Sequence, residues 1–163
     1  MRVPSLVVEE NGTESVLIQA PAILEWLDEV YSEPPFLPRD PAARAKARAI
    51  AAIIACDIHP LDNLSTLEYL RNKLGVQEAE LDEWYAYWIM DGFSAIEKLL
   101  EPAPFAVGTH PTVADICLVP QVYNARRFKV PLGDFPKIEA VVRACQQLEA
   151  FSSAAPENQP DAE

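Results

Sequence analysis

The chain has 163 residues, half of them hydrophobic, and its 25 acidic and 13 basic side chains give a formal charge of −12. A chain of this length buries one hydrophobic core, or one core with a small appendage. Its negative charge opposes binding to nucleic acid or to an anionic membrane surface, and no apolar run is long enough to span a bilayer. We therefore predict a globular cytoplasmic protein and exclude nucleic acid and membranes as partners.

The first 31 residues predict two short strands followed by a helix. An Asn11-Gly12 step separates the β-rich runs 6–8 and 16–18, and this dipeptide is the strongest short-range signal for a hairpin. From residue 22 to residue 31 the apolar side chains recur at helical spacing. A two-stranded hairpin is marginally stable alone and leaves an open edge, so this ββα unit looks incomplete.

The next segment, residues 32–38, holds three prolines and predicts a stiff linker at a domain boundary. Everything after the linker reads as helix. Asp40 is placed to cap the first helix, and Thr112 with Asp115 forms a capping-box-like pair at the start of a later one. The further predicted helices span 78–100, 113–123 and 136–148, and the remainder, 152–163, reads as a polar tail.

One helical stretch, CDIHPLDNLSTLEYL from residue 56 to residue 70, contains polar residues where a structural helix would carry none. A proline in a helix interior removes a backbone hydrogen bond and costs about 3 kcal/mol, so Pro60 predicts a kink. The alternative is a kinked core helix whose polar groups are satisfied. The cluster of His59, Asn63 and Ser65 favours a ligand site.

The cysteines are Cys56, Cys117 and Cys145, and they are odd in number and widely separated within apolar helical patterns. This pattern is typical of reduced, buried thiols and not of a disulfide framework. The two histidines lack the spacing of metal ligands, so we predict no metal site.

Several segments together resemble the zeta-class glutathione transferases, which include maleylacetoacetate isomerase. The matching segments are RVPSL (2–6), QAPAILEWL (19–27), HPLDNLS (59–65), DICLVPQVYNARRF (115–128) and PENQPD (156–161). The resemblance implies a mainly α glutathione transferase fold with a partial thioredoxin-like ββα unit. In that fold, residues 1–31 are the end of the glutathione-binding domain, 32–38 the linker and 39–163 the all-helical C-terminal domain.

The same resemblance implies a homodimer that uses glutathione as a cofactor to isomerise an unsaturated diketo acid such as maleylacetoacetate. The implied glutathione-binding residues are Val3, Pro4, Gln19, Ala20, His59, Asn63, Leu64 and Ser65. Arg127, or its neighbour Arg126, is the implied ligand of a carboxylate on the dicarboxylate substrate. In the simpler alternatives, Gln19 is an ordinary strand end, Pro4 an edge-strand proline, and the two arginines a solvated helix terminus.

Two departures from the family pattern affect the expected activity. Family members begin with a βαβ unit whose serine motif holds the glutathione thiolate, and this sequence has no counterpart of it, so we assign no catalytic residue. Ala20 stands where the family commonly has serine. We therefore expect little isomerase activity from the chain as given. The alternatives are maleylpyruvate isomerase or another zeta-class activity, and a non-catalytic module for binding or oligomerisation.

Overall fold

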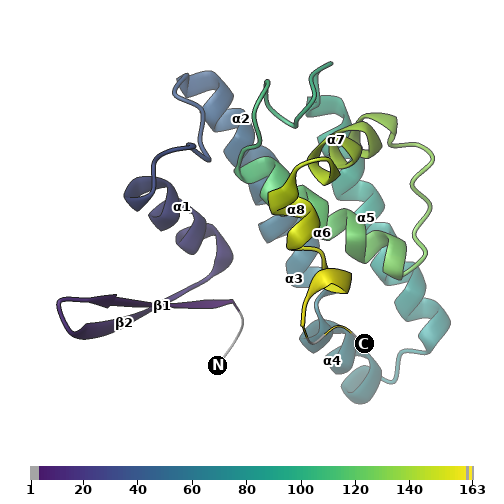
Figure 1. Cartoon of the computed structure of the whole chain (residues 1–163). Coiled ribbons are helices and arrows are strands. Elements are labelled where there is room, and N and C mark those ends of the chain that lie inside the picture. The colour runs from purple at the N-terminus through teal and green to yellow at the C-terminus, as the bar shows by residue number, and fades with distance from the viewer. Residues whose placement is uncertain (1–3, 161, 163) are drawn as a thin grey trace.

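The structure, a computed structural model, describes residues 4–160 and 162. A small ββα unit comes first, and every later element in the described part of the chain is a helix, as the sequence predicts. Figure 1 shows the hairpin and the first helix lying to one side of the bundle formed by the later helices. In chain order the elements are β1 (Ser5–Glu10), β2 (Thr13–Ile18), α1 (Ala20–Val30), α2 (Pro41–Ala52), the π-helix η1 (Ile53–Ile58), α3 (His59–Asp62), α4 (Leu64–Leu74), α5 (Glu78–Leu99), α6 (Val113–Arg127), α7 (Pro136–Gln146), α8 (Glu149–Ser153) and the 3₁₀-helix η2 (Pro156–Asn158).

The predicted hairpin is confirmed. β1 and β2 pair antiparallel, with Ser5 opposite Ile18 at the open end. Asn11 and Gly12 form the turn with φ of 52° and 76°, the left-handed conformation that a two-residue hairpin turn of this sense requires. One face of the hairpin stays open to solvent, because Val7, Val16 and Ile18 remain more than half exposed.

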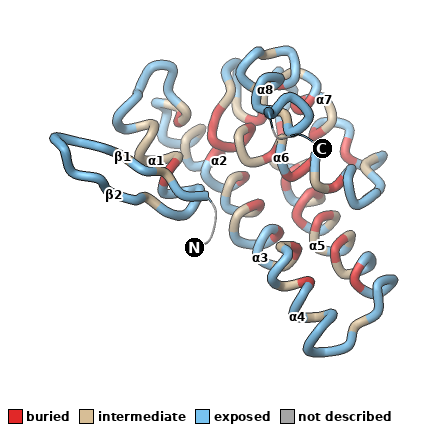
Figure 2. Tube along the Cα trace, turned by 60° about the horizontal axis from the view of Figure 1, so that its bottom comes forward, coloured by how far each residue is buried: buried red, intermediate tan, exposed pale blue. Residues whose placement is uncertain are grey.

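The core lies within the helical bundle, where Figure 2 shows the buried positions concentrated. Its largest fully buried side chains come from α2, η1, α5, α6 and α7: Phe93, Ile50, Ile58, Ile89, Ile96, Leu118, Ile138, Val122, Val141 and Val142. α5 continues through Gly92 without interruption. A Cβ at residue 92 would collide with the Ile58 side chain, so glycine lets η1 approach α5 closely.

Both predicted helix caps are confirmed. The Asp40 side chain accepts a hydrogen bond from the backbone N–H of Ala43 at 2.8 Å. Asp115 accepts from the Thr112 backbone at 2.8 Å and from the Thr112 hydroxyl at 3.0 Å. The other Asp115 oxygen accepts from the Ala106 backbone at 2.8 Å, which ties the preceding loop to α6.

At the predicted kink, a π-helix is followed by an interruption of the helix at Asn63. η1 interrupts the α-helical hydrogen bonding just before Pro60, and Asn63 then takes an extended conformation with φ −72° and ψ 157°. The expected burial of all three cysteines is wrong, because Cys56 on η1 is exposed. A π-helical turn contains one residue more than an α-helical turn, which changes the side chains that face the core. In η1 these are Ile54 and Ile58, and Cys56 between them is exposed.

The last residues are more ordered than the predicted polar tail. Residues of α8 and η2 are joined by the Asn158 side chain, which donates to the Ser152 carbonyl at 2.7 Å. The Gln159 side chain donates to the Ser153 carbonyl at 2.8 Å. The polar composition of this segment suggested an irregular tail, but Pro156 and Asn158 favour turns, and the turn allows these local hydrogen bonds. Along the described part of the chain, no helix combines the length and apolarity needed to cross a bilayer.

Candidate functional site

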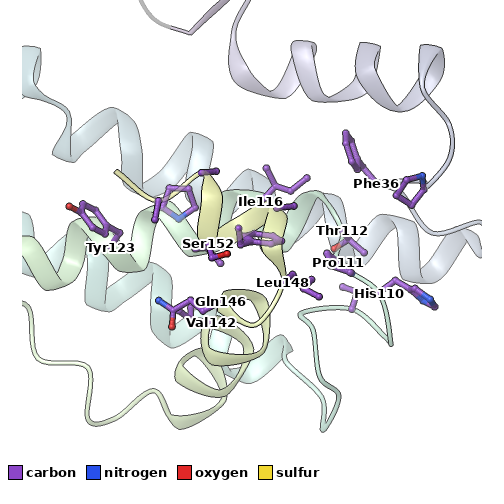
Figure 3. A pocket seen from close by; sticks show the side chains of 18 of the residues that line it. Phe36, His110, Pro111, Thr112, Ile116, Tyr123, Val142, Gln146, Leu148 and Ser152 are labelled. Carbon is purple, nitrogen blue, oxygen red and sulfur yellow. The ribbon is translucent and has the colours of Figure 1, made fainter. Parts of the chain in front are cut away.

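A groove of about 2000 Å³ runs between the linker and the helical bundle. Residues 34–38 of the linker form one wall, and the loop before α6, α6 itself and the α8–η2 segment form the others. Figure 3 shows Phe36 on the linker side and Ile116, Leu148 and Ser152 on the bundle side. The lining is mainly apolar, with Phe36, Val107, Ile116, Val119, Leu148 and Phe151 among its residues.

The linker wall is held by hydrogen bonds from two helices. The Asp28 carboxylate on α1 accepts from the backbone N–H of Phe36 at 2.5 Å and from that of Leu37 at 3.1 Å. On the other side, the Val113 N–H at the start of α6 donates to the Phe36 carbonyl at 2.9 Å. Phe36 is therefore fixed at the groove by α1 and α6 together.

One end of the groove is polar and carries the predicted arginines. Tyr123, which Figure 3 places far from Phe36, lies here with Asn124, Arg126 and Arg127 on α6 and Glu157 on η2. Hydrogen bonding to the Glu157 carboxylate raises the pKa of the Tyr123 phenol, and the positive charge of Arg127 opposes this rise.

The two arginines differ in their partners. Arg126 donates to Glu139 on α7 at 2.7 Å. Arg127 is exposed and makes no ion pair within residues 4–160. Because its guanidinium is not engaged, Arg127 is the arginine available to an anion in the groove.

The predicted glutathione residues of the ββα unit converge at the open end of the hairpin. Pairing of Ser5 with Ile18 puts Pro4 opposite Gln19, and Ala20 is the first residue of α1. Gln19 has φ 74° and ψ 117°, a conformation that costs a non-glycine residue about 1–3 kcal/mol and is found most at ligand clamps. Val3 and its bond to Pro4 lie outside the described residues.

The other predicted glutathione residues lie where α3 meets α4. His59, Leu64 and Ser65 are exposed there. The Asn63 side chain caps α4, accepting from the Thr66 backbone at 3.1 Å and from the Ser65 hydroxyl at 2.5 Å. Among the described residues, neither this set nor the hairpin set lines the groove, whereas both arginines do.

Comparison with known proteins identifies the family of this chain. A model of the "Glutathione S-transferase, C-terminal domain" family matches residues 78–144. Maleylpyruvate isomerase of a Ralstonia species is 51% identical over 98% of this chain and 75% of its own length. The holo structure of a maleylpyruvate isomerase, described as a bacterial zeta-class glutathione transferase, has a TM-score of 0.93 and 49% identity over 99% of this chain and 76% of that one. The chain belongs to the zeta class of glutathione transferases.

A third relative of this transferase is maleylacetoacetate isomerase of Anaeromyxobacter dehalogenans 2CP-1. Its structure, with dicarboxyethyl glutathione and citrate bound in the active site, has a TM-score of 0.94 and 41% identity, and covers all of this chain and 74% of that one. The predicted fold class, a mainly α glutathione transferase fold with a ββα unit followed by an all-helical domain, is thereby confirmed.

Sequence reasoning missed three residues that shape the groove of this transferase. Phe36 was read only as part of a proline-rich linker, and Asp28, which holds it, only as part of a helix. Glu157 lies in the PENQPD segment that resembles the family, but it was assigned no role there. The signal that could have indicated Glu157 was the Pro156-to-Asn158 turn sequence, because such residues order a chain locally.

Proposed function

We propose that this transferase supports the glutathione-dependent cis–trans isomerisation of an unsaturated diketo acid, such as maleylacetoacetate or maleylpyruvate. The names of its relatives support this reaction class. The observation on this chain that carries the proposal is Arg127, an unengaged cation at the polar end of an apolar groove. Such a site suits a substrate with a carboxylate at one end and a conjugated carbon chain beyond it.

The residues at the open end of the hairpin suit the cofactor. Glutathione, when bound, supplies the thiolate that adds to the conjugated double bond and departs after the resulting single bond has rotated. The N-terminus of α1 offers free backbone N–H groups to a carboxylate, and Gln19 is held there in a strained conformation. In this proposal the backbone of Val3, next to Pro4, would pair with the peptide part of the cofactor.

The remaining predicted residues complete the proposed binding site. His59, Asn63, Leu64 and Ser65 would close the glutathione site from the helical domain. For Asn63 and Ser65 this requires that they exchange a capping hydrogen bond for one to the ligand, since the two side chains now bond each other. Ala20 offers no hydroxyl, so the backbone and Gln19 carry the polar contacts at its end of the site.

We also propose a homodimer in the cytoplasm that acts in the breakdown of aromatic compounds such as aromatic amino acids. The open hairpin face, with Val7, Val16 and Ile18 more than half exposed, supports self-association because exposed apolar patches and open edges seek partners. Three free cysteines suit a reducing compartment. The boundary at residues 32–38 is part of the same proposal.

Calorimetry with dicarboxyethyl glutathione tests the carboxylate site. A charge-assisted contact is worth roughly 1.5–3 kcal/mol, so Arg127→Ala should weaken binding about ten- to a hundredfold. Binding of plain glutathione should change little. Arg126→Ala is the matched control, because Arg126 is already paired with Glu139. A larger effect of Arg126→Ala would make the choice of arginine wrong, and no binding of either ligand to the unmodified chain would contradict the proposed function.

A further inference from the structure

A buried carboxyl group lies one residue before the α3–α4 junction. Asp62 is only 5% exposed, and Gln121 on α6 is only 3% exposed. The Gln121 side-chain amide donates to the Asp62 carboxylate at 3.0 Å, which makes a buried hydrogen bond between residues 59 positions apart. In a low-dielectric interior such a bond is strong when it is made and costly when one partner is removed.

The position of this bond is informative because it joins two parts of the proposed site. α3 begins at His59 and is followed directly by Asn63, two of the proposed glutathione residues. Gln121 lies on α6, which ends at Arg127, the proposed carboxylate ligand. The same turn is fixed to α5 as well, because the Trp84 indole N–H donates to the Leu61 carbonyl at 2.8 Å. Figure 1 shows α3 running beneath α6 in the bundle.

We propose that Asp62 and Gln121 are positioning residues, which hold the α3–α4 junction on α6 and thereby set the glutathione segment relative to Arg127. This inference rests on the proposed function. Neither residue touches the groove, so neither is assigned a catalytic role. Their action is through the placement of Asn63 and His59, which follow and precede Asp62 on the same turn.

The charges around Asp62 make its bond to Gln121 sensitive to pH. Burial raises the pKa of Asp62 to about 6, while the bond from Gln121 and the nearby His59 act in the opposite direction. From α5, the buried Tyr85 also faces Asp62, and Arg127 on α6 acts on that tyrosine. The acids of the other adjoining elements, Asp57 on η1 and Glu68 on α4, are exposed. Protonation of Asp62 removes its negative charge and adds an O–H donor, while the remaining carbonyl oxygen can still accept from Gln121, so the bond persists but loses its charge assistance.

Nuclear magnetic resonance tests the inference without any ligand. Between pH 5 and 8 the Gln121 side-chain amide and the Asn63 backbone amide should titrate with a common midpoint near pH 6. Asp62→Asn should remove this titration from both resonances, and Gln121→Leu should raise the midpoint seen at Asn63. Asp57→Asn is the matched control, since it removes the same charge from an exposed site nearby. It should leave the titration of both the Gln121 and the Asn63 resonances unchanged. If Gln121 titrates and Asn63 does not, Asp62 does not position the junction and the inference is wrong.

Glutathione binding at pH 7.5 supplies the second readout. Asp62→Ala should weaken glutathione about tenfold, while Asp62→Asn, which can still accept from Gln121, should restore the affinity to within about twofold of the unmodified chain. Equal affinity of the two variants would overturn the inference. If the unmodified chain does not bind glutathione, the proposed function fails, and the resonance titration alone then decides whether the bond positions the junction.

Discussion

The ββα unit and the helical bundle are stabilised in different ways. In the bundle, α5 alone contributes Ile89, Phe93 and Ile96 with no exposed surface. Among residues 4–31, Ile23 is the only buried hydrophobic residue, and it retains 9% exposure. Figure 2 shows the same contrast, with the hairpin exposed along nearly its whole length. The bundle has a core of its own, whereas the ββα unit buries too little apolar surface to be stable without neighbours.

Polar contacts attach the ββα unit to the rest of the chain. The Asp28 carboxylate accepts from the linker backbone, and Glu25 pairs with Arg48 of α2 through two hydrogen bonds. Such contacts orient a unit but contribute less stability than buried apolar area. The comparison therefore predicts that the two regions respond unequally to matched substitutions.

The largest expected difference is between two isoleucines. Ile89→Ala in the bundle should lower the free energy of unfolding by about 4 kcal/mol, because it leaves a cavity in a closed core. Ile23→Ala should cost about 2 kcal/mol at most and loosen only the ββα unit, whose surroundings can collapse. Urea unfolding followed by tryptophan fluorescence measures both, since Trp26 reports on α1 while Trp84 and Trp88 report on α5. Equal losses from the two substitutions would break the comparison.

The next prediction compares two helix-capping carboxylates within the bundle. Asp115 is fully buried and accepts three hydrogen bonds from the Ala106 and Thr112 groups. Its replacement by alanine leaves buried donors unpaired and should cost about 3 kcal/mol. Asp40→Ala is the matched control, because this exposed cap accepts one bond, and it should cost about 1 kcal/mol. An Asp115→Ala protein as stable as Asp40→Ala in chemical denaturation would show that the loop before α6 rearranges to satisfy its own donors.

The difference between these caps and the buried Asp62 shows which features a sequence can reveal. The caps were predicted because a side chain and the N–H it binds lie within three residues of each other. The hairpin turn was predicted for the same reason, since Asn11 and Gly12 adopt their conformation locally. The bond between Asp62 and Gln121 depends on how two distant helices pack, and no local pattern specifies that.

The same difference between local and long-range contacts explains which residues of the candidate site the sequence indicated. Arg127 was predicted as a carboxylate ligand from the family segment it belongs to, and it lines the groove, but its role stays a prediction. The groove itself is formed by segments remote in sequence, so Phe36 and Glu157 gave no signal as a pair. No pattern in the sequence indicated the role of Gly92 either. Glycine is required there because a Cβ would collide with the side chain of Ile58 on η1, which is remote in sequence.

The pH dependence of the unfolding free energy sharpens the comparison, because it identifies a destabilising buried carboxyl group, Asp62, inside the bundle. The pKa of Asp62 is raised from 3.8 to about 6, so the folded chain binds its proton more tightly than the unfolded chain does. The stabilisation is present below about pH 4 and is lost as the pH rises through 6, by about 3 kcal/mol. Asp62→Asn should remove this loss and make the protein more stable than the unmodified chain above pH 6. Thermal unfolding at pH 5 and pH 8 measures it, and a variant without this gain at pH 8 would contradict the raised pKa.

The smallest expected effect concerns the ion pair that joins the two regions. Arg48 donates to both carboxylate oxygens of Glu25, at 2.8 and 2.9 Å, while the side chains remain 50% and 40% exposed. Exposed pairs contribute about 0.2–1 kcal/mol and weaken as salt is added. A double-mutant cycle of Arg48→Ala and Glu25→Ala should therefore give a coupling free energy of about 0.5 kcal/mol at low salt.

The matched control for this ion pair is Arg71 with Glu78, because it has the same two-bond geometry but joins α4 to α5 within the bundle. Hydrogen exchange separates the two pairs. Loss of Arg48 should speed exchange at the α1 amides about twofold and leave α5 unchanged, because α1 can open without the bundle. Loss of Arg71 should leave α1 unchanged. If Arg48→Ala instead speeds exchange equally in α1 and α5, the two regions open as one unit, and the ββα unit is stabilised by the bundle far more than its exposed polar contacts indicate.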